Sequence, residues 1–310
     1  MPEGNTQTEL EQHIIRTMLY FDIFNYPLKS DEVHKYLQVN SVTRDDVESV
    51  LITLAEKKEI FRFGNLFSIR NESAHAERRQ RGNEMALKLL PFAKRRGVFI
   101  SKFPFVKAVM ASGSFSKDYM DEKSDLDFFI VTESGKLWIA RTLLVLYKRI
   151  LLFNSHKYFC INYLVDETHL EIEEKNLFTA TELASLIPLQ NPNMYKKLIA
   201  ANTWLKGVFP NFKSREVTHV AGSKRVFLKI FFEALLRPFA PKLENLFMAI
   251  TLKRFHRIYQ KHYSAKDFRI AFKTKKHASK NHPKNYQKKI MEVYHEKVNE
   301  FFRHETIARS

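Results

Sequence analysis

Two short apolar segments of the sequence enclose a pair of aspartates. Residues 106–111 and 126–131 are predicted to form neighbouring buried strands. Asp125 and Asp127 lie where the second strand begins, and strand alternation points both side chains to the same face. Two carboxylates about 4 Å apart repel by roughly 4 kcal/mol at an effective dielectric of about 20. The pair therefore needs a partner of opposite charge.

A divalent cation would be such a partner, because carboxylate oxygens suit Mg²⁺ or Mn²⁺, which also bind nucleotide phosphates. Gly113 and Ser114 follow the first strand as a turn that opens a helix. Glycine lets the backbone approach a phosphate closely, and the serine hydroxyl and the helix amides can bind phosphate oxygens. The pattern predicts a site for a triphosphate and its metal ions. The alternative is an Asx turn that leads into an ordinary strand.

At these residues the sequence resembles the nucleotidyltransferase superfamily of the DNA polymerase β type. The signature of that superfamily is Gly, then Gly or Ser, a spacer, and Asp-x-Asp/Glu between apolar residues, and Gly113, Ser114, Asp125 and Asp127 match it. The resemblance implies a bacterial or archaeal protein that transfers a nucleoside monophosphate from an NTP, expected to be ATP, to a hydroxyl acceptor. It also implies Mg²⁺ or Mn²⁺ as cofactor, and it leaves the acceptor open.

Two further residues are expected to contact the nucleotide. Bacterial relatives often continue Gly-Ser-x-Ala-Arg-Gly, and this chain has Lys117 in place of the arginine. Lys117 is therefore expected to take over the phosphate contact. Ser124, directly before the aspartate pair, is assigned to the same nucleotide-binding set.

The third carboxylate of the superfamily is not evident in the sequence. The next strand, 158–165, has no acid in its middle, and Asn162 is the position that we expect to replace it. If residues 166–169 form a hairpin turn, the returning strand places Glu171 on the face of Asn162, where it is the substitute ligand. An amide can bind a metal but cannot accept the proton of an attacking hydroxyl. A degenerate site that binds nucleotide without catalysis is the alternative.

The pattern predicts an α+β fold with three parts. Residues 1–70 have the helices and the hairpin of a winged-helix-like module, whose acidic third helix favours packing or acceptor docking over DNA reading. Residues 71–175 are expected to form a polymerase-β-like nucleotidyltransferase domain, a mixed sheet backed by helices. Residues 176–310 are expected to form a helical C-terminal domain.

Charge and composition limit the partners. The chain has 310 residues and a net charge of +17, and basic residues with interleaved aromatics recur from Lys253 to Lys289. This segment, with residues 273–283 expected as an exposed loop, is a candidate contact for RNA or DNA. The competing interpretations are an ordinary solvated face and steering of a small anion. The single cysteine, Cys160, allows no internal disulfide, and no run of 18 uncharged apolar residues occurs, so we expect a soluble cytoplasmic protein.

The sequence thus predicts a metal-dependent nucleotidyltransferase. The alternative is a non-catalytic regulatory protein that binds nucleotide or nucleic acid through a degenerate nucleotidyltransferase site.

Overall fold

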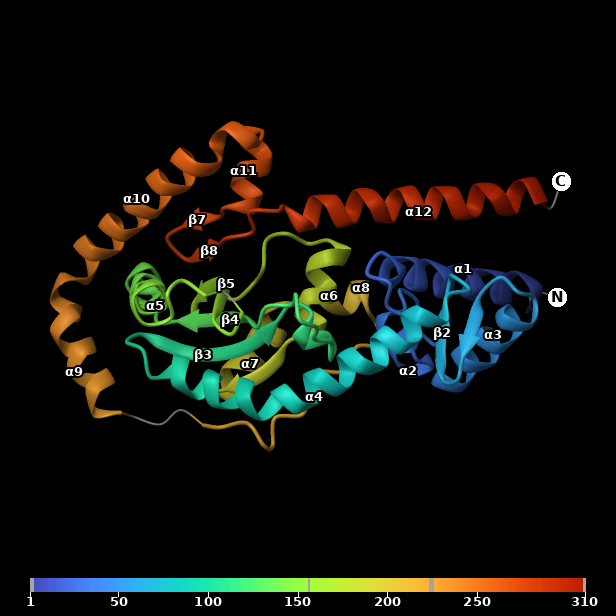
Figure 1. The fold of residues 1–310 in the computed structure, drawn as a ribbon, viewed down its shortest axis with the longest axis horizontal. Coiled ribbons are helices and arrows are strands. Elements are labelled where there is room, and N and C mark those ends of the chain that lie inside the picture. Colours follow the sequence, from blue (N-terminus) through green and yellow to red (C-terminus); the bar gives the residue numbers. More distant parts are fainter. Residues whose placement is uncertain (1–2, 156, 223–225, 309–310) are drawn as a thin grey trace.

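A six-stranded mixed sheet lies at the centre of the computed structural model, which describes residues 3–155, 157–222 and 226–308 (Figure 1). The strands, in sheet order, are β6 (Ile187–Gln190), β3 (Val106–Ser112), β4 (Asp127–Thr132), β5 (Cys160–Asp166), β8 (Ala278–Lys280) and β7 (Thr274–Lys275). β4 and β5 are parallel, and the other neighbours are antiparallel. The strands predicted at 106–111 and 126–131 are confirmed, and the mixed sheet fits the α+β class.

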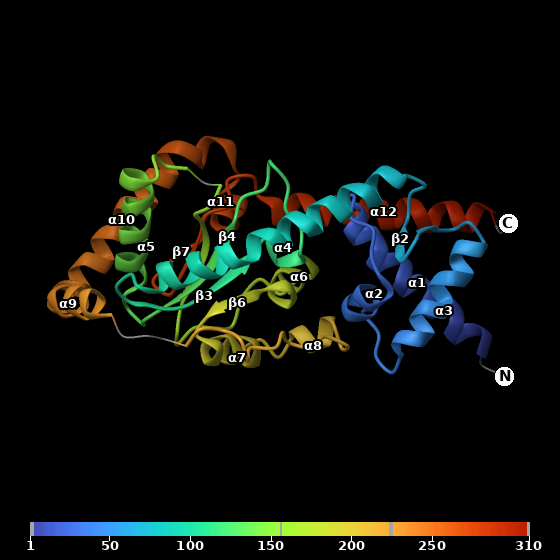
Figure 2. The same ribbon diagram turned by 60° about the horizontal axis from the view of Figure 1, so that its bottom comes forward.

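Side-chain alternation in β3 and β4 builds a core on each face of the sheet. Val109 and Ile130 pack into one core, and Met110 and Phe129 pack into the other. The first core is covered by helices α4 (Ser73–Ser101), α5 (Leu137–Leu151) and α10 (Ala240–Tyr259). The second core is covered by helices α6 (Leu177–Ser185), α7 (Pro192–Ala201) and α8 (Leu205–Val208). In Figure 2, α5 of the first layer and α7 of the second lie on opposite sides of the sheet.

The N-terminal part lies at one end of the molecule (Figure 2). Its elements are α1 (Glu3–Asp22), α2 (Ser30–Tyr36), α3 (Arg44–Glu56), β1 (Phe61–Phe63) and β2 (Leu66–Ser68). A capping box precedes α3, because Thr43 accepts from the Asp46 amide and Asp46 accepts from the Thr43 amide. The three helices and the hairpin are as predicted, and their identity as a winged helix remains a prediction.

The C-terminal part contacts the rest of the molecule through its strands in the sheet and through its last helix. Its remaining elements are α9 (Phe227–Leu236), α11 (Ala265–Ala271), α12 (Tyr286–Ala308) and the 3₁₀ turns η2 (Arg237–Phe239) and η3 (Gln260–His262). α12 runs back beside α1, where Lys297 pairs with Asp22 at 2.7 Å (Figure 1). The C-terminal part, expected as a helical domain, also contributes strands, since β6, β7 and β8 all join the central sheet.

The predicted hairpin after β5 is also wrong. A turn does follow Asp166, but no strand forms in the described stretch 170–175. The antiparallel neighbour of β5 is instead β8, which lies more than a hundred residues later in the sequence and pairs Lys280 with Tyr163. The segment expected as an exposed loop is therefore a β-hairpin at the edge of the sheet. Across the described residues, no helix is both long and apolar enough to cross a membrane.

Candidate functional site

The predicted glycine turn and the aspartate strand meet at one end of the sheet. Ser112, the last residue of β3, pairs with Asp127, the first residue of β4, so the turn that follows β3 lies against the Asp127 carboxylate. Gly113 has φ +67, a conformation that strongly favours glycine. A Cβ at this position would overlap the carboxylate of Asp127 and lie 3.2 Å from its Cγ. The local geometry therefore requires glycine for two independent reasons.

Asp127 is in an environment that disfavours its charge. Its pKa is raised to about 7, chiefly by burial and also by the neighbouring charges of Asp125 and Glu182. A hydrogen bond from the Cys160 thiol and the charge of Lys117 act in the opposite direction. A carboxylate with this pKa, beside a second aspartate, is suited to bind a cation that would hold it ionised.

The residue opposite Asp127 on β5 is Cys160. The ladder is regular up to Phe128 and Ile161 and then shifts, so that Phe129 faces Tyr163 and Asn162 falls at the irregularity. Ile161 and Tyr163 consequently pack in opposite cores, although regular alternation along a strand would place them on one face. The thiol is inert, because burial raises its pKa above the ordinary value and the charge of Asp127 adds to this.

Asn162 and Glu171, the two candidate third ligands, have different surroundings. Asn162 is half-buried, and its backbone carbonyl accepts from the Asn281 amide at 3.3 Å. Its role as a ligand remains a prediction. Glu171 is exposed, pairs with Lys175 at 2.7 Å and belongs to no strand. The hairpin that would have brought Glu171 to the aspartate pair is not formed, so the basis for its role as substitute is removed.

Lys117 lies at the glycine turn, as predicted, but an acid binds it there. Its Nζ donates to Glu182 Oε1 at 2.6 Å and to the carbonyl of Gly113 at 3.1 Å. Glu182, on α6, was missed by sequence reasoning. Asn176 caps α6 through the Thr179 amide and so predicts a helix there, but the sequence contains no signal that this helix faces the turn.

The turn itself is shorter than expected. Instead of a helix, the 3₁₀ turn η1 (Phe115–Lys117) follows Ser114, whose side chain is half-buried. A single 3₁₀ turn offers fewer free amides than an α-helix N-terminus. Ser124 lies nearby, where its hydroxyl donates to Asp121 Oδ1 at 2.7 Å and closes a local turn. Its predicted contact with nucleotide would have to replace that bond.

Distant segments hold the turn in place. The Tyr26 hydroxyl donates to the carbonyl of Lys117 at 2.9 Å, and Asn83 donates to the carbonyl of Asp118. Arg215 donates to the carbonyl of Ser116 at 2.8 Å. The N-terminal part, α4 and the segment after α8 thus all fix the backbone beside the aspartate pair. This arrangement supports a preformed site rather than a mobile loop.

Two further polar groups belong to this end of the sheet. Ser112 is buried, and its hydroxyl has no hydrogen-bond partner among the residues that the structure describes. Lys148 of α5 is buried too, and its cation acts electrostatically on Cys160 and Asp125. Both residues were missed, because neither belongs to a motif.

The carboxylate oxygens of this site suit a hard divalent cation, although the site offers few ligands. Asp125 and Asp127 would hold the cation, and the free Ser112 hydroxyl offers a neutral oxygen beside them. A thiol is a poor ligand for Mg²⁺, so Cys160 adds nothing to this set. Within the described ranges, no group of three or more His, Cys, Asp or Glu residues is placed to hold a metal ion.

The predicted basic segment is partly neutralised within the protein. Lys273 is buried and pairs with Glu174 at 2.7 Å and with Glu173 at 3.2 Å. Lys275 pairs with Glu173 at 2.7 Å. These two lysines are structural ion pairs and are not free to follow a phosphate backbone, whereas Lys276 is exposed.

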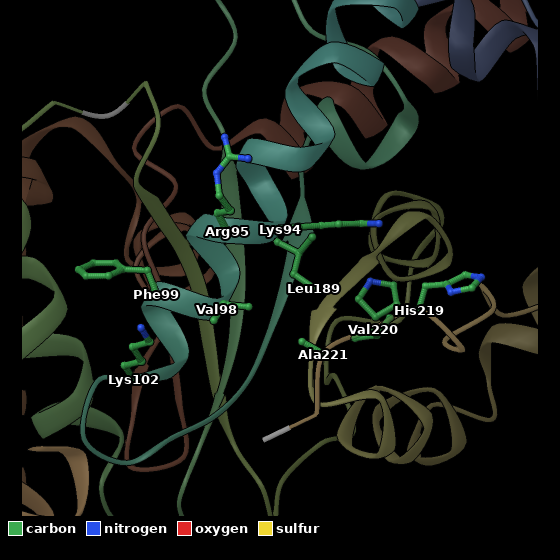
Figure 3. Close-up of a pocket in the computed structure, with 10 residues that line it drawn as sticks. Lys94, Arg95, Val98, Phe99, Lys102, Leu189, His219, Val220 and Ala221 are labelled. Carbon is green, nitrogen blue, oxygen red and sulfur yellow. The ribbon is translucent and has the colours of Figure 1, made fainter. Parts of the chain in front are cut away.

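A separate concavity of about 410 Å³ lies between α4 and the β6 edge (Figure 3). Lys94, Arg95, Lys102 and His219 contribute to its lining, and Lys94 extends toward the segment that carries His219 while Arg95 points away. The concavity shares no residue with the aspartate site. It is therefore not the place where the chemistry of Asp125 and Asp127 would occur.

Comparison with protein families gives one match. Residues 94–180 match the family described as "Nucleotidyltransferase domain". This range contains the glycine turn, both aspartates and Cys160, and it ends just before Glu182. Comparisons with curated proteins and with solved structures gave no match. The family match supports a nucleotidyltransferase domain in this part of the chain, and such a domain implies a nucleotide substrate.

Proposed function

We propose that the protein transfers a nucleoside monophosphate from an NTP, with ATP as the expected donor, to a hydroxyl acceptor at the site of Asp125 and Asp127. The observation that carries the proposal is the contact between Gly113 and the half-buried Asp127 carboxylate. It joins the two halves of the nucleotidyltransferase signature in space, inside the stretch that matches the family.

The chain's own residues would act as follows. Asp125 and Asp127 hold Mg²⁺ or Mn²⁺, which when bound neutralises phosphate charge and orients the phosphates for in-line attack. Gly113 and Ser114 lie against the β- and γ-phosphates. Lys117 exchanges its contact with Glu182 for a phosphate oxygen.

Glu182 is the candidate third acid of this site. Its charge already acts on Asp127, and the loss of its partner Lys117 to a phosphate would free the carboxylate. A free carboxylate can accept the proton that the acceptor hydroxyl loses as its oxygen bonds to the α-phosphorus and pyrophosphate leaves. Asn162 remains the alternative third ligand, without this capacity.

A second function is favoured by one observation. The residue opposite Asp127 is a protonated thiol and not a carboxylate. A site that binds an NTP without turnover would need no more than the two aspartates, and the protein would then act as a nucleotide- or nucleic-acid-binding regulator.

One experiment separates the two functions. The melting temperature is measured with each NTP and with Mg²⁺ or Mn²⁺, and α-labelled NTP is incubated with a cell lysate to find the labelled acceptor. A ligand at about 100 times its Kd stabilises by about 2.7 kcal/mol, which a melting shift detects. Asp127→Ala should abolish the shift, and the exposed Asp45→Ala on α3 should leave it unchanged.

Metal-dependent binding together with label transfer supports the enzyme. Binding without transfer supports the regulator. The absence of any metal-dependent shift in the wild type would refute both functions at this site.

A further inference from the structure

Helix α9 is oriented with its apolar side chains toward solvent. None of its residues is buried, although the helix is made mainly of large apolar residues. The exposed ones, with their exposed fractions, are Phe227 (79%), Leu228 (62%), Ile230 (47%), Phe231 (52%), Phe232 (45%) and Leu235 (53%). A surface helix of a globular protein normally buries such residues and exposes its polar ones.

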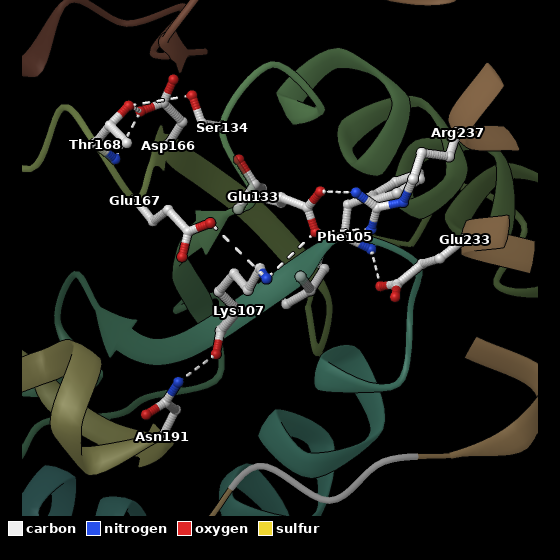
Figure 4. A network of polar contacts seen from close by, with 12 residues as sticks. Phe105, Lys107, Glu133, Ser134, Asp166, Glu167, Thr168, Asn191, Glu233 and Arg237 are labelled. Atoms are coloured by element: carbon white, nitrogen blue, oxygen red, sulfur yellow. Dashed lines mark hydrogen bonds and ion pairs between the residues drawn. The ribbon is translucent and has the colours of Figure 1, made fainter. Parts of the chain in front are cut away.

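The polar side chains of α9 and η2 face the protein instead. Lys229 donates to the carbonyl of Ser101 at 2.9 Å, and Glu233 accepts from the Phe105 amide at 2.7 Å. Arg237 pairs with Glu133 at 2.6 Å (Figure 4). These three residues are spaced by four and lie on one side of the helix. Their contacts attach α9 to the sheet, so the opposite, apolar side of the helix faces outward.

The apolar surface continues past Pro238 onto α10. Phe239, Leu246 and Ile250 are 59%, 51% and 56% exposed. We call these three residues and the six exposed residues of α9 the outer apolar face. α9 and α10 lie along the end of the molecule farthest from the N-terminal part in both views (Figures 1 and 2). Contiguous exposed apolar surface of this kind marks an interaction site.

The charges around this face have one sign. Between residues 226 and 263 the acids are Glu233 and Glu244, and both are turned inward, because Glu244 accepts from the Ile139 amide at 2.7 Å. Lys229 and Arg237 of the same stretch are used in the inward contacts, whereas Lys242, Lys253, Arg254 and Arg257 are exposed.

We propose that the outer apolar face inserts into the surface of a membrane that contains anionic lipid. Apolar side chains flanked by cations, without exposed acids, match the boundary between acyl chains and anionic headgroups. Since no described helix can span a bilayer, the attachment is peripheral. A second copy of the chain fits this face poorly, because it brings another +17 charge and the same flanking cations.

The test uses the full chain in flotation with vesicles of phosphatidylcholine alone and of phosphatidylcholine mixed with phosphatidylglycerol. The protein should float with the mixed vesicles and bind the neutral ones at least about ten-fold more weakly. The double change Phe231→Asp with Leu235→Asp should lower binding to the mixed vesicles by more than about ten-fold. The matched control, Leu87→Asp on α4, changes a leucine that is 71% exposed and should bind like the wild type.

Light scattering and melting curves complete the test. A monomer that binds mixed vesicles, and a double variant that keeps the wild-type melting temperature but does not bind, support the proposal. Failure of the wild type to float would overturn it. So would a wild-type dimer that the double change dissociates, because a second copy would then cover the face, and so would an unaffected double variant.

Discussion

The Cβ that Gly113 lacks would occupy the place of the Asp127 carboxylate. Both residues come from the signature that the sequence shows, but their contact depends on the antiparallel pairing of β3 with β4. Glycine at this position therefore leaves room for the carboxylate and also permits the backbone conformation of the turn.

Gly113→Ala should abolish metal-dependent NTP binding, because the methyl group displaces the Asp127 carboxylate. It should also lower the melting temperature by several degrees, since a non-glycine residue at positive φ costs about 1 kcal/mol before any overlap is counted. Gly135→Ala is the matched control, with φ +65 and no atom within 4 Å of the added Cβ. Equal effects of the two changes on binding would show that the overlap does not matter.

The stability of the protein should fall as the pH rises from about 4 to about 7, in the absence of divalent cations, through the titration of Asp127. Its pKa is raised in the folded protein, so the unfolded chain loses this proton at lower pH and is thereby stabilised relative to the folded protein. Asp127→Asn should remove this contribution, on the order of a few kcal/mol at most. Melting curves of wild type and variant should converge near pH 4 and separate above it.

The same pKa predicts the pH dependence of binding. Metal-dependent NTP binding needs the ionised carboxylate and should strengthen as the pH rises through about 7. Asp45→Asn serves as the control for general effects of pH. A difference between wild type and Asp127→Asn that does not change with pH would contradict the assigned environment of Asp127.

Cys160→Asp should restore a third carboxylate directly opposite Asp127. Without divalent cations it should destabilise the protein by about 1 kcal/mol or more, because two acids then face each other across the strands. Mg²⁺ or Mn²⁺ should reverse this loss and raise label transfer. Cys160→Ser keeps a hydrogen-bond donor and should change little.

Asn162→Asp provides the comparison for that change. An acid at position 162 would supply a carboxylate where the third acid was expected, but the register of β5 predicts a smaller gain in transfer than that of Cys160→Asp. Transfer that rises with Asn162→Asp and not with Cys160→Asp would show that the irregularity in β5 turns Asn162 toward the metal.

Lys273 and Lys276 should differ in their effects despite their proximity in sequence. Lys273→Ala removes a buried cation and leaves the half-buried Glu174 without its partner, so it should lower the melting temperature by several degrees. Lys276→Ala changes an exposed residue and should leave stability unchanged.

If the exposed cations of residues 253–289 contact RNA or DNA, Lys276→Ala should reduce the slope of log affinity against log salt by about one unit. Filter binding at several salt concentrations measures this slope, and a wild type without measurable affinity would exclude nucleic acid as a partner.

Part of this protein was determined by sequence alone, because the relevant signals are local. The strands β3 and β4, the capped helix α3 and the hairpin of β1 and β2 follow from periodicity, capping residues and turn residues over a few positions. Gly113, Asp125 and Asp127 were identified in the same way, by residue type and spacing.

The tertiary structure decided what depends on partners distant in sequence. The neighbour of β5 is β8, and not the segment after the turn at Asp166, because a strand edge selects its partner by packing over the whole chain. An irregularity of one residue at Asn162 placed Cys160 opposite Asp127, a shift that no pattern of period two can reveal. Lys117 pairs with Glu182 of a separate helix. The polar side chains of α9 bind the sheet, so its apolar side faces outward. Both arrangements depend on polar contacts between elements that are distant in sequence. Local sequence sets which elements form, and the pairing of remote groups in the fold sets what each element faces.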